Sequence, residues 1–249
     1  MTLTAISLLI AGPFAGSLAG VLINRLPDHR PVALDRSRCD TCGQPIAPYD
    51  LIPLASYTLL RGRCRACHAP IGRFHVHVEL AALAIAASAV LCDPDPLRQI
   101  ADCILGWTLL ALAWIDIRHL ILPDSLTLPL ILAGLAEAAL TTGGDPAAIP
   151  PRALGAALAW LTFALTAFLY RRIRKRDGLG AGDAKLFAAG GAWLGPDALA
   201  PCLLLAALIG LAMALSAMIR TRRFAATLRL PFGPPLALAI WTLRLLWPT

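Results

Sequence analysis

Long apolar segments alternate with short polar ones along most of the chain. Charged residues are missing from 1–24, 153–170 and 198–219, and each run is close to the roughly 20 residues with which a helix crosses a bilayer. Five weaker segments complete a set of eight predicted spans: 74–92, 97–115, 125–141, 184–194 and 230–247. The segment at 184–194 is short, and its Gly190–Gly191 pair lowers its helix propensity. The pattern predicts an all-α polytopic membrane protein with about eight transmembrane helices.

A polar stretch at 25–73 separates the first two predicted spans. It is long enough to form a small domain, although it is too short to bury much apolar core. The hydropathy pattern therefore divides the chain into three parts: a first transmembrane helix at 1–24, an insert at 25–73 and a multi-span region at 74–249.

Composition and charge place this chain in a membrane and give it an orientation. Hydrophobic residues make up 58% of the chain and charged residues 15%, whereas soluble domains carry about a quarter charged residues. If the eight spans alternate, 19 of the 22 Lys and Arg residues fall on one side, in the segments 25–73, 116–124, 171–185 and 220–229. The positive-inside rule makes that side cytoplasmic. The net charge of +7 is thus accounted for by topology, and no nucleic-acid partner is expected.

Four of the seven cysteines lie in the insert, in two copies of the pattern R-C-x-x-C-x-x-P-I that begin at Arg38 and Arg63. Their spacing, C-x2-C, 21 residues and C-x2-C, is close to that of a four-thiolate zinc site. Disulfides rarely persist in the reducing cytoplasm, and a metal ion would stabilise so small a domain. We expect structural zinc at Cys39, Cys42, Cys64 and Cys67; an iron centre or a redox pair is the alternative.

The other three cysteines, Cys92, Cys103 and Cys202, occur in apolar runs. Free cysteine is among the residues most often buried. All three are therefore expected to be ordinary buried thiols.

Acidic residues inside the predicted spans are candidates for function, because burying a charge in a membrane is costly. Asp102 and Glu137 lie toward the outer side, and we expect them to bond to each other or to interfacial water. Asp116 ends the third predicted span and Asp183 begins the sixth, so both are expected at the cytoplasmic edge. Two carboxyl groups brought close together share one proton, which is the arrangement of an aspartic protease.

Three glycines, Gly178, Gly180 and Gly182, precede Asp183. Flexible backbone there would let an extended peptide approach the carboxyl group. Two other interpretations remain open: Asp183 as a helix cap, and Asp116 as a residue whose side chain extends to the interface. Asp124 competes as the first partner of the pair, although its position in "PDSLTLPL" is typical of a helix N-cap.

The motifs together resemble those of a known family. They are "INRLP", "CDTC", "PYDLIPLASYTLLRGRCRAC", "RFHVHVEL", "IDIRHLILPDSLTLPL", "GLGAGDAKLFAAGGAWLG" and "PFGPPLALA", in this order over nearly the whole chain. The chain resembles bacterial type IV prepilin leader peptidases, which are bifunctional peptidases and N-methyltransferases that also process type II secretion pseudopilins. Its G-x-G-D element is similar to that of the presenilin and signal-peptide-peptidase class.

The resemblance implies catalytic roles for Asp116 and Asp183. It implies a prepilin substrate whose short basic leader is cut at the cytoplasmic face of the inner membrane, after a glycine. It also implies S-adenosylmethionine as the donor that methylates the new amino terminus, with the insert taking part. Leu51 stands where many relatives carry Asn, which bears on the methyl-transfer half.

Two rival functions come from other classes. A proton-coupled transporter would favour acidic residues near the membrane midplane and broken helices in matched halves. A membrane-tethered zinc-ribbon binding module would need the cysteines and not the aspartates. Whether the client belongs to a pilus or to a secretion system stays open.

Overall fold

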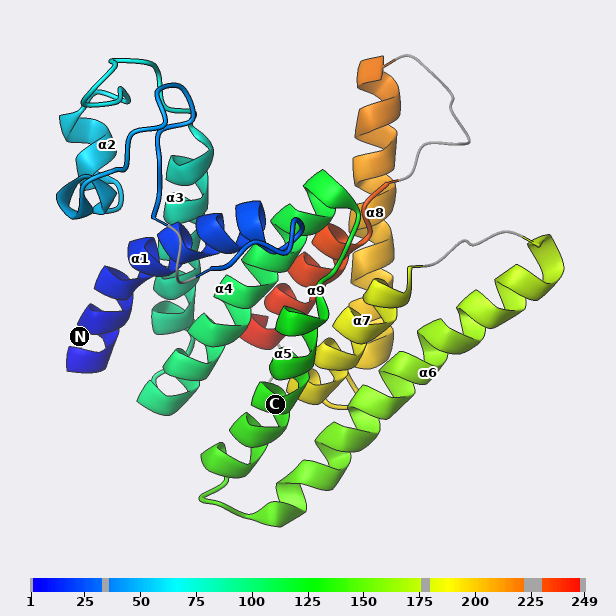
Figure 1. Cartoon of the computed structure of the whole chain (residues 1–249). Coiled ribbons are helices and arrows are strands. Elements are labelled where there is room, and N and C mark those ends of the chain that lie inside the picture. Colours follow the sequence, from blue (N-terminus) through cyan, green and yellow to red (C-terminus); the bar gives the residue numbers. More distant parts are fainter. Residues whose placement is uncertain (1, 33–35, 176–179, 222–229, 247–249) are drawn as a thin grey trace. The chain divides into compact units, whose positions relative to one another are not determined.

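The computed structural model describes residues 2–32, 36–175, 180–221 and 230–246, and over these residues the chain is helical with no β-strand. The helices labelled in Figure 1 are α1 (Leu3–Arg25), α2 (Ala55–Leu59), α3 (Phe74–Cys92), α4 (Pro96–His119), α5 (Asp124–Thr141), α6 (Ile149–Arg174), α7 (Ala181–Leu194), α8 (Leu199–Thr221) and α9 (Gly233–Leu246). Two 3-10 turns, η1 (Pro48–Leu51) and η2 (Pro146–Ala148), complete the elements. The predicted all-α class is confirmed.

Each of the eight predicted spans coincides with one helix. Six of the described helices are long enough and apolar enough to cross a membrane: α1, α3, α4, α5, α6 and α8. The other two, α7 and α9, have 14 residues each, so each is about 21 Å long against a hydrocarbon core of about 30 Å. Trp247, in the last predicted span, lies outside the described residues.

The chain forms two compact units, residues 1–111 and 112–249. In the first unit, α1 packs closely against α3 through Gly12, Gly16 and Gly20, which repeat every four residues. A Cβ atom on Gly16 would lie 2.9 Å from the backbone oxygen of Val78. Small residues at this spacing let two membrane helices bring their backbones together, so the first predicted span is held against α3.

In the second unit, α7 is enclosed by α5, α6 and α9 (Figure 1), and all its residues from Ala184 to Leu194 except Lys185 are buried. Gly190 lies against Ile240 of α9, whose Cδ1 atom would be 2.9 Å from an added Cβ. Gly191 lies against Gly155 of α6. The glycine pair that weakens this segment as an isolated helix thus lets its neighbours pack closely around it.

Candidate active site and metal centre

The two C-x2-C motifs of the insert come together. The Sγ atoms of Cys39, Cys42, Cys64 and Cys67 all lie within 4.8 Å of one another, and those of Cys39 and Cys67 are 3.8 Å apart. Sulfurs held about 2.3 Å from a tetrahedral zinc ion are about 3.8 Å from one another. The four thiols therefore fit a zinc ion.

The sequence repeat of the insert is also a structural repeat. In each copy the amide of the first cysteine donates to the carbonyl five residues later, at 2.9 Å, and the amide four residues later donates back to the cysteine carbonyl. An isolated β-bridge closes each turn. The fourth residue after the first cysteine has a left-handed backbone in both copies, with φ of 71° at Gly43 and 57° at His68. Each copy presents two thiols from the same tight turn.

Backbone amides also prepare one of these thiols for metal binding. The N–H groups of Cys42 and Thr41 lower the pKa of the Cys39 thiol to about 6, because they stabilise its thiolate. The thiolate is the form that binds metals. The geometry of the four-cysteine cluster therefore fits the expected zinc site.

An ion pair attaches the preceding turn to the second cysteine motif. The Nε and terminal nitrogen of Arg65 donate to the two carboxylate oxygens of Asp50 at 2.8 and 2.6 Å. The hydrogen bond from Arg65 lowers the pKa of Asp50. The Arg65 guanidinium also lies over the Tyr49 ring, 5.4 Å from its centroid. The motif "PYDL" in η1 is therefore held against the residues between Cys64 and Cys67.

A buried carboxylate joins the insert to α3. Glu79 is 6% exposed, and its Oε2 accepts a 2.8 Å hydrogen bond from the amide of Leu54. Leu54 has φ of 60° and ψ of −47°, a conformation that L residues rarely adopt and that surrounding contacts must hold. Glu79 supplies one such contact.

The cysteines outside the insert differ from one another. Cys103 and Cys202 are buried as expected, but Cys92, the last residue of α3, is exposed. The prediction of a buried Cys92 is wrong because an apolar run does not show which residues face a neighbouring helix.

Asp116 lies near the end of α4, where it meets the first residue of α9. Its side chain is buried, and its Oδ2 accepts a 2.8 Å hydrogen bond from the amide of Gly233. A helix begins with amides that have no partner inside the helix, so the carboxyl group fills a natural acceptor position. This partner lies 117 residues away along the chain.

Asp183 lies in the first turn of α7 and is half-buried. It is close enough to Asp116 for the charges of the two carboxyl groups to interact. Asp116 and Asp183, which the sequence singled out, thus lie near each other within residues 112–249, on two different helices.

The glycines before Asp183 make room for side chains. Gly178 lies outside the described residues. A Cβ on Gly180, the N-cap of α7, would lie 3.1 Å from Oδ2 of Asp183, and one on Gly182 would lie 2.9 Å from Cβ of Leu122. Close packing explains these two positions, whereas the sequence suggested flexible backbone for a substrate.

Asp124 has a different environment from the two aspartates of the site. It is the first residue of α5, is exposed, and pairs with Lys185 at 2.5 Å. The N-cap position belongs to Pro123. Asp124 therefore has a structural role in an ion pair, and the predicted role as a helix cap is wrong.

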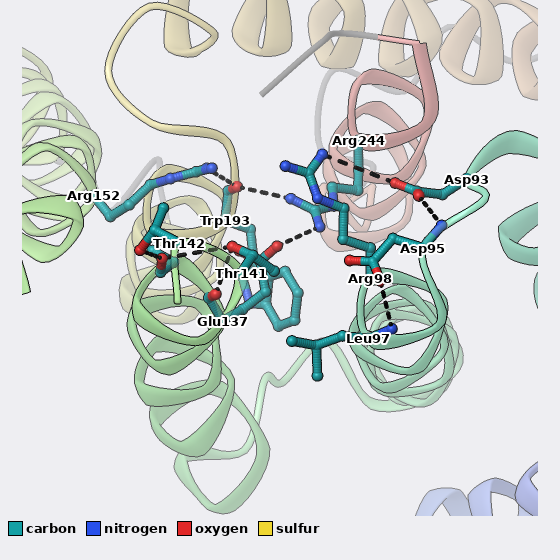
Figure 2. Close-up of polar contacts among 11 residues, drawn as sticks. Asp93, Asp95, Leu97, Arg98, Glu137, Thr141, Thr142, Arg152, Trp193 and Arg244 are labelled. Atoms are coloured by element: carbon teal, nitrogen blue, oxygen red, sulfur yellow. Dashed lines mark hydrogen bonds and ion pairs between the residues drawn. The ribbon is translucent and has the colours of Figure 1, made fainter. Parts of the chain in front are cut away.

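Two arginines hold the opposite end of α7, as Figure 2 shows. Arg152 and Arg244 both donate to the backbone carbonyl of Trp193, and the Arg244 guanidinium lies 5.5 Å from the centre of a Trp193 ring. Arg244 also donates to Oε1 of Glu137 at 2.7 Å, with the two side chains 3% and 5% exposed. Asp102 or interfacial water was the expected partner of Glu137. Arg244 could not be identified from the sequence, because it lies 107 residues further along the chain.

The Glu137–Arg244 pair leads to a stability prediction. Arg244→Met leaves Glu137 buried without its cation, which we expect to cost about 3–5 kcal/mol. Adding Glu137→Gln removes the unpaired charge, so the double variant should unfold at a higher temperature than Arg244→Met alone. Thermal unfolding in detergent measures both. A double variant less stable than Arg244→Met by the full effect of Glu137→Gln would show that the two residues are uncoupled.

Known proteins match both parts of the chain. Residues 10–92 match the family model of the bacterial peptidase A24 N-terminal domain, and residues 103–215 match that of the type IV leader peptidase family. Three curated relatives are each named prepilin leader peptidase/N-methyltransferase. The Aeromonas hydrophila protein is 38% identical over 212 residues, which are 85% of this chain and 71% of the relative.

The other two relatives have similar identities. The protein of Burkholderia pseudomallei strain 1026b is 40% identical over 213 residues, 85% of this chain and 67% of the relative. The Stutzerimonas stutzeri protein is 33% identical over 262 residues, 96% of this chain and 89% of the relative. No solved structure matches the chain.

The fold and the site describe a multi-pass helical membrane protein with two interacting aspartates and a four-cysteine insert. With these matches, the chain belongs to the type IV leader peptidase family. The first matched range contains the four cysteines and the second contains both Asp116 and Asp183. The predicted family, and with it the predicted class of enzyme, is confirmed.

Proposed function

We propose that the protein cuts the leader from type IV prepilins or type II secretion pseudopilins, using Asp116 and Asp183 as its catalytic pair. The observation that carries this proposal is the interaction between the two carboxyl groups, which lie on different helices but both within residues 112–249. Such proximity is what a two-aspartate peptidase requires. The relatives' names supply the class of substrate.

The mechanism follows from the chemistry of paired carboxyl groups. Two such groups in one site share a proton, so one is charged and the other is neutral. The charged group takes a proton from a water molecule as its oxygen attacks the peptide carbonyl. The neutral group donates a hydrogen bond to the carbonyl oxygen. A proton then passes to the leaving amine, which separates the leader from the pilin.

We place this chemistry at the cytoplasmic face of the bacterial inner membrane. The asymmetry of Lys and Arg residues supports that orientation. So does α7: Asp183 is in its first turn, about 15 Å along the helix from Trp193, whose carbonyl binds Arg152 and Arg244. With Arg98, these are the three basic residues that lie outside the four segments predicted to be cytoplasmic. The substrate helix would approach from the bilayer, with its leader in the cytoplasm.

The second proposed activity is N-methylation of the new amino terminus. The relatives are named for both activities, and S-adenosylmethionine would be the methyl donor. Cys39, Cys42, Cys64 and Cys67 would hold a zinc ion that stabilises the insert. By resemblance, the insert takes part in methyl transfer.

The structure gives less support to the rival functions. A proton relay would use acidic groups along a pathway, but the buried Glu137 is paired with Arg244. A zinc-ribbon binding module does not require two aspartates to lie together.

Purified protein in detergent, incubated with a synthetic prepilin and labelled S-adenosylmethionine, tests the proposal. We expect a shortened pilin that carries label on its amino terminus, both detected by mass spectrometry. Intact prepilin after long incubation would refute the peptidase proposal. Cleaved but unlabelled pilin would refute the methyl-transfer half alone.

A further inference from the structure

The beginning of α9 makes a close contact with Asp116 that leaves no space for a side chain. Besides the hydrogen bond from the Gly233 amide to Asp116, a Cβ atom on Gly233 would lie 2.7 Å from Oδ2 of Asp116 and 3.1 Å from its Cβ. Any residue larger than glycine would therefore displace the carboxyl group or α9. Gly233 controls where the Asp116 carboxyl group lies.

The residue before Gly233 connects the same segment to α7. The ring of Phe232 lies 6.1 Å from that of Phe163 in α6, and the ring of Phe163 lies 4.8 Å from that of Phe187 in α7. Phe187 is four residues after Asp183, one helical turn away on the same face. A row of three aromatic rings thus runs from the start of α9 to the helix turn that follows Asp183.

Prolines and burial keep this segment in place. Pro231 precedes Phe232, and Pro234 and Pro235 follow Gly233. Proline fixes its own φ angle and restricts the residue before it. Pro235 and Leu236 are buried in the first turn of α9. The segment 231–233 is therefore a stiff element with one contact to each side of the aspartate pair.

We propose that the segment 231–233 is a positioning element, in which the Gly233 amide orients Asp116 and Phe232 sets its separation from Asp183 through Phe163 and Phe187. These residues need not touch the substrate. They act by holding two carboxyl groups at the spacing that proton sharing and water attack require. This inference rests on the proposed peptidase function.

The test compares cleavage kinetics of the full-length protein and its Gly233→Ala variant on a synthetic prepilin in detergent. The added methyl group should move the Asp116 carboxyl group. Because a misplacement of about 1 Å can cost about a hundredfold in rate, we expect kcat to fall by about that factor. KM should stay close to the wild-type value, because the added methyl group displaces a carboxyl group that acts in the chemical step. A merely structural role would lower the amount of folded enzyme and not separate kcat from KM in this way.

Gly210→Ala is the matched control. A Cβ there would lie in the same region, 3.7 Å from the side chains of Phe232 and Pro235, which is ordinary van der Waals contact. It should leave both kinetic constants unchanged. Phe163→Leu opens the aromatic row without touching either aspartate, and it should also lower kcat at constant KM. If Gly233→Ala does not fold, the kinetics of Phe163→Leu test the proposal.

Wild-type kcat in Gly233→Ala would overturn the inference while leaving the peptidase proposal intact. Wild-type kcat in Phe163→Leu would overturn the proposed role of the aromatic rings in setting the distance between Asp116 and Asp183. Absence of cleavage by the wild-type protein would overturn the peptidase function and this inference together.

Discussion

Asp116→Asn and Asp183→Asn are each expected to lower the rate of leader cleavage by about a thousandfold or more. Asparagine has nearly the same shape as aspartate, but it neither accepts nor releases a proton at neutral pH. Proton transfer by a positioned side chain contributes about 10²–10⁴-fold to a rate, and a pair that shares one proton fails when either member is lost. Single-turnover cleavage of a synthetic prepilin, followed by mass spectrometry, measures the loss.

Asp124→Asn provides the matched control. Asp124 belongs to the same sequence motif as Asp116, but it is exposed and paired with Lys185. Exposed ion pairs contribute about 0–1 kcal/mol to stability, so this variant should cleave at nearly the wild-type rate. Should Asp124→Asn be inactive while Asp116→Asn still cleaves, the catalytic pair would have to be reassigned to Asp124 and Asp183.

The methyl-transfer assay separates loss of chemistry from loss of fold. A pilin peptide that already lacks its leader needs no cleavage. Asp116→Asn should therefore methylate it as the wild-type protein does. If both activities disappear together, the variant has lost its structure and its cleavage defect says nothing about catalysis.

The membrane helices could be predicted well from sequence, because a run of apolar residues is a local property. The weakest predicted span, now α7, shows the limit of that reasoning. Gly190 and Gly191 disfavour an isolated helix, and only the packing of α6 and α9 against them explains why the helix forms. Helix packing depends on residues far away in the sequence, so local propensity underestimates this segment.

The same limit applies to the site. Asp116 and Asp183 could be singled out because a carboxylate in an apolar span is costly. Their supporting contacts could not, since Gly233 is 117 residues from Asp116. A signal was present in the sequence: "PFGPP" has a glycine among prolines at the start of an apolar segment, which marks a stiff turn where something approaches closely.

The four-cysteine cluster was easier to predict because its thiols come from two local turns of the same kind. Four thiols at C-x2-C spacing specify the metal site almost independently of the rest of the fold. The exposure of Cys92 depends on which face of α3 packs against α1, and a run of apolar residues does not show which face that is. Metal-ligand motifs can therefore be predicted from sequence more reliably than the burial of single residues.

Replacing Cys64 by serine is expected to remove zinc from the purified protein and to disorder the insert. Structural zinc contributes about 10–16 kcal/mol to the folding of small zinc-binding peptides, and the insert has little apolar core to compensate. The wild-type protein should contain one zinc ion per chain by elemental analysis, and Cys64→Ser should contain almost none. Limited proteolysis should then cut the variant within residues 36–73 while the transmembrane region stays intact.

Cys92→Ser is the control, because Cys92 is exposed and lies outside the cluster; it should keep its zinc and its resistance to proteolysis. The two activities should also respond differently to Cys64→Ser. If the insert takes part in methyl transfer as proposed, that activity should be lost. Asp116 and Asp183 lie in the other compact unit, so cleavage should largely remain. A zinc-free insert that resists proteolysis would contradict the proposed role of the metal. Loss of cleavage with the membrane helices still folded would instead mean that the insert helps to bind the prepilin.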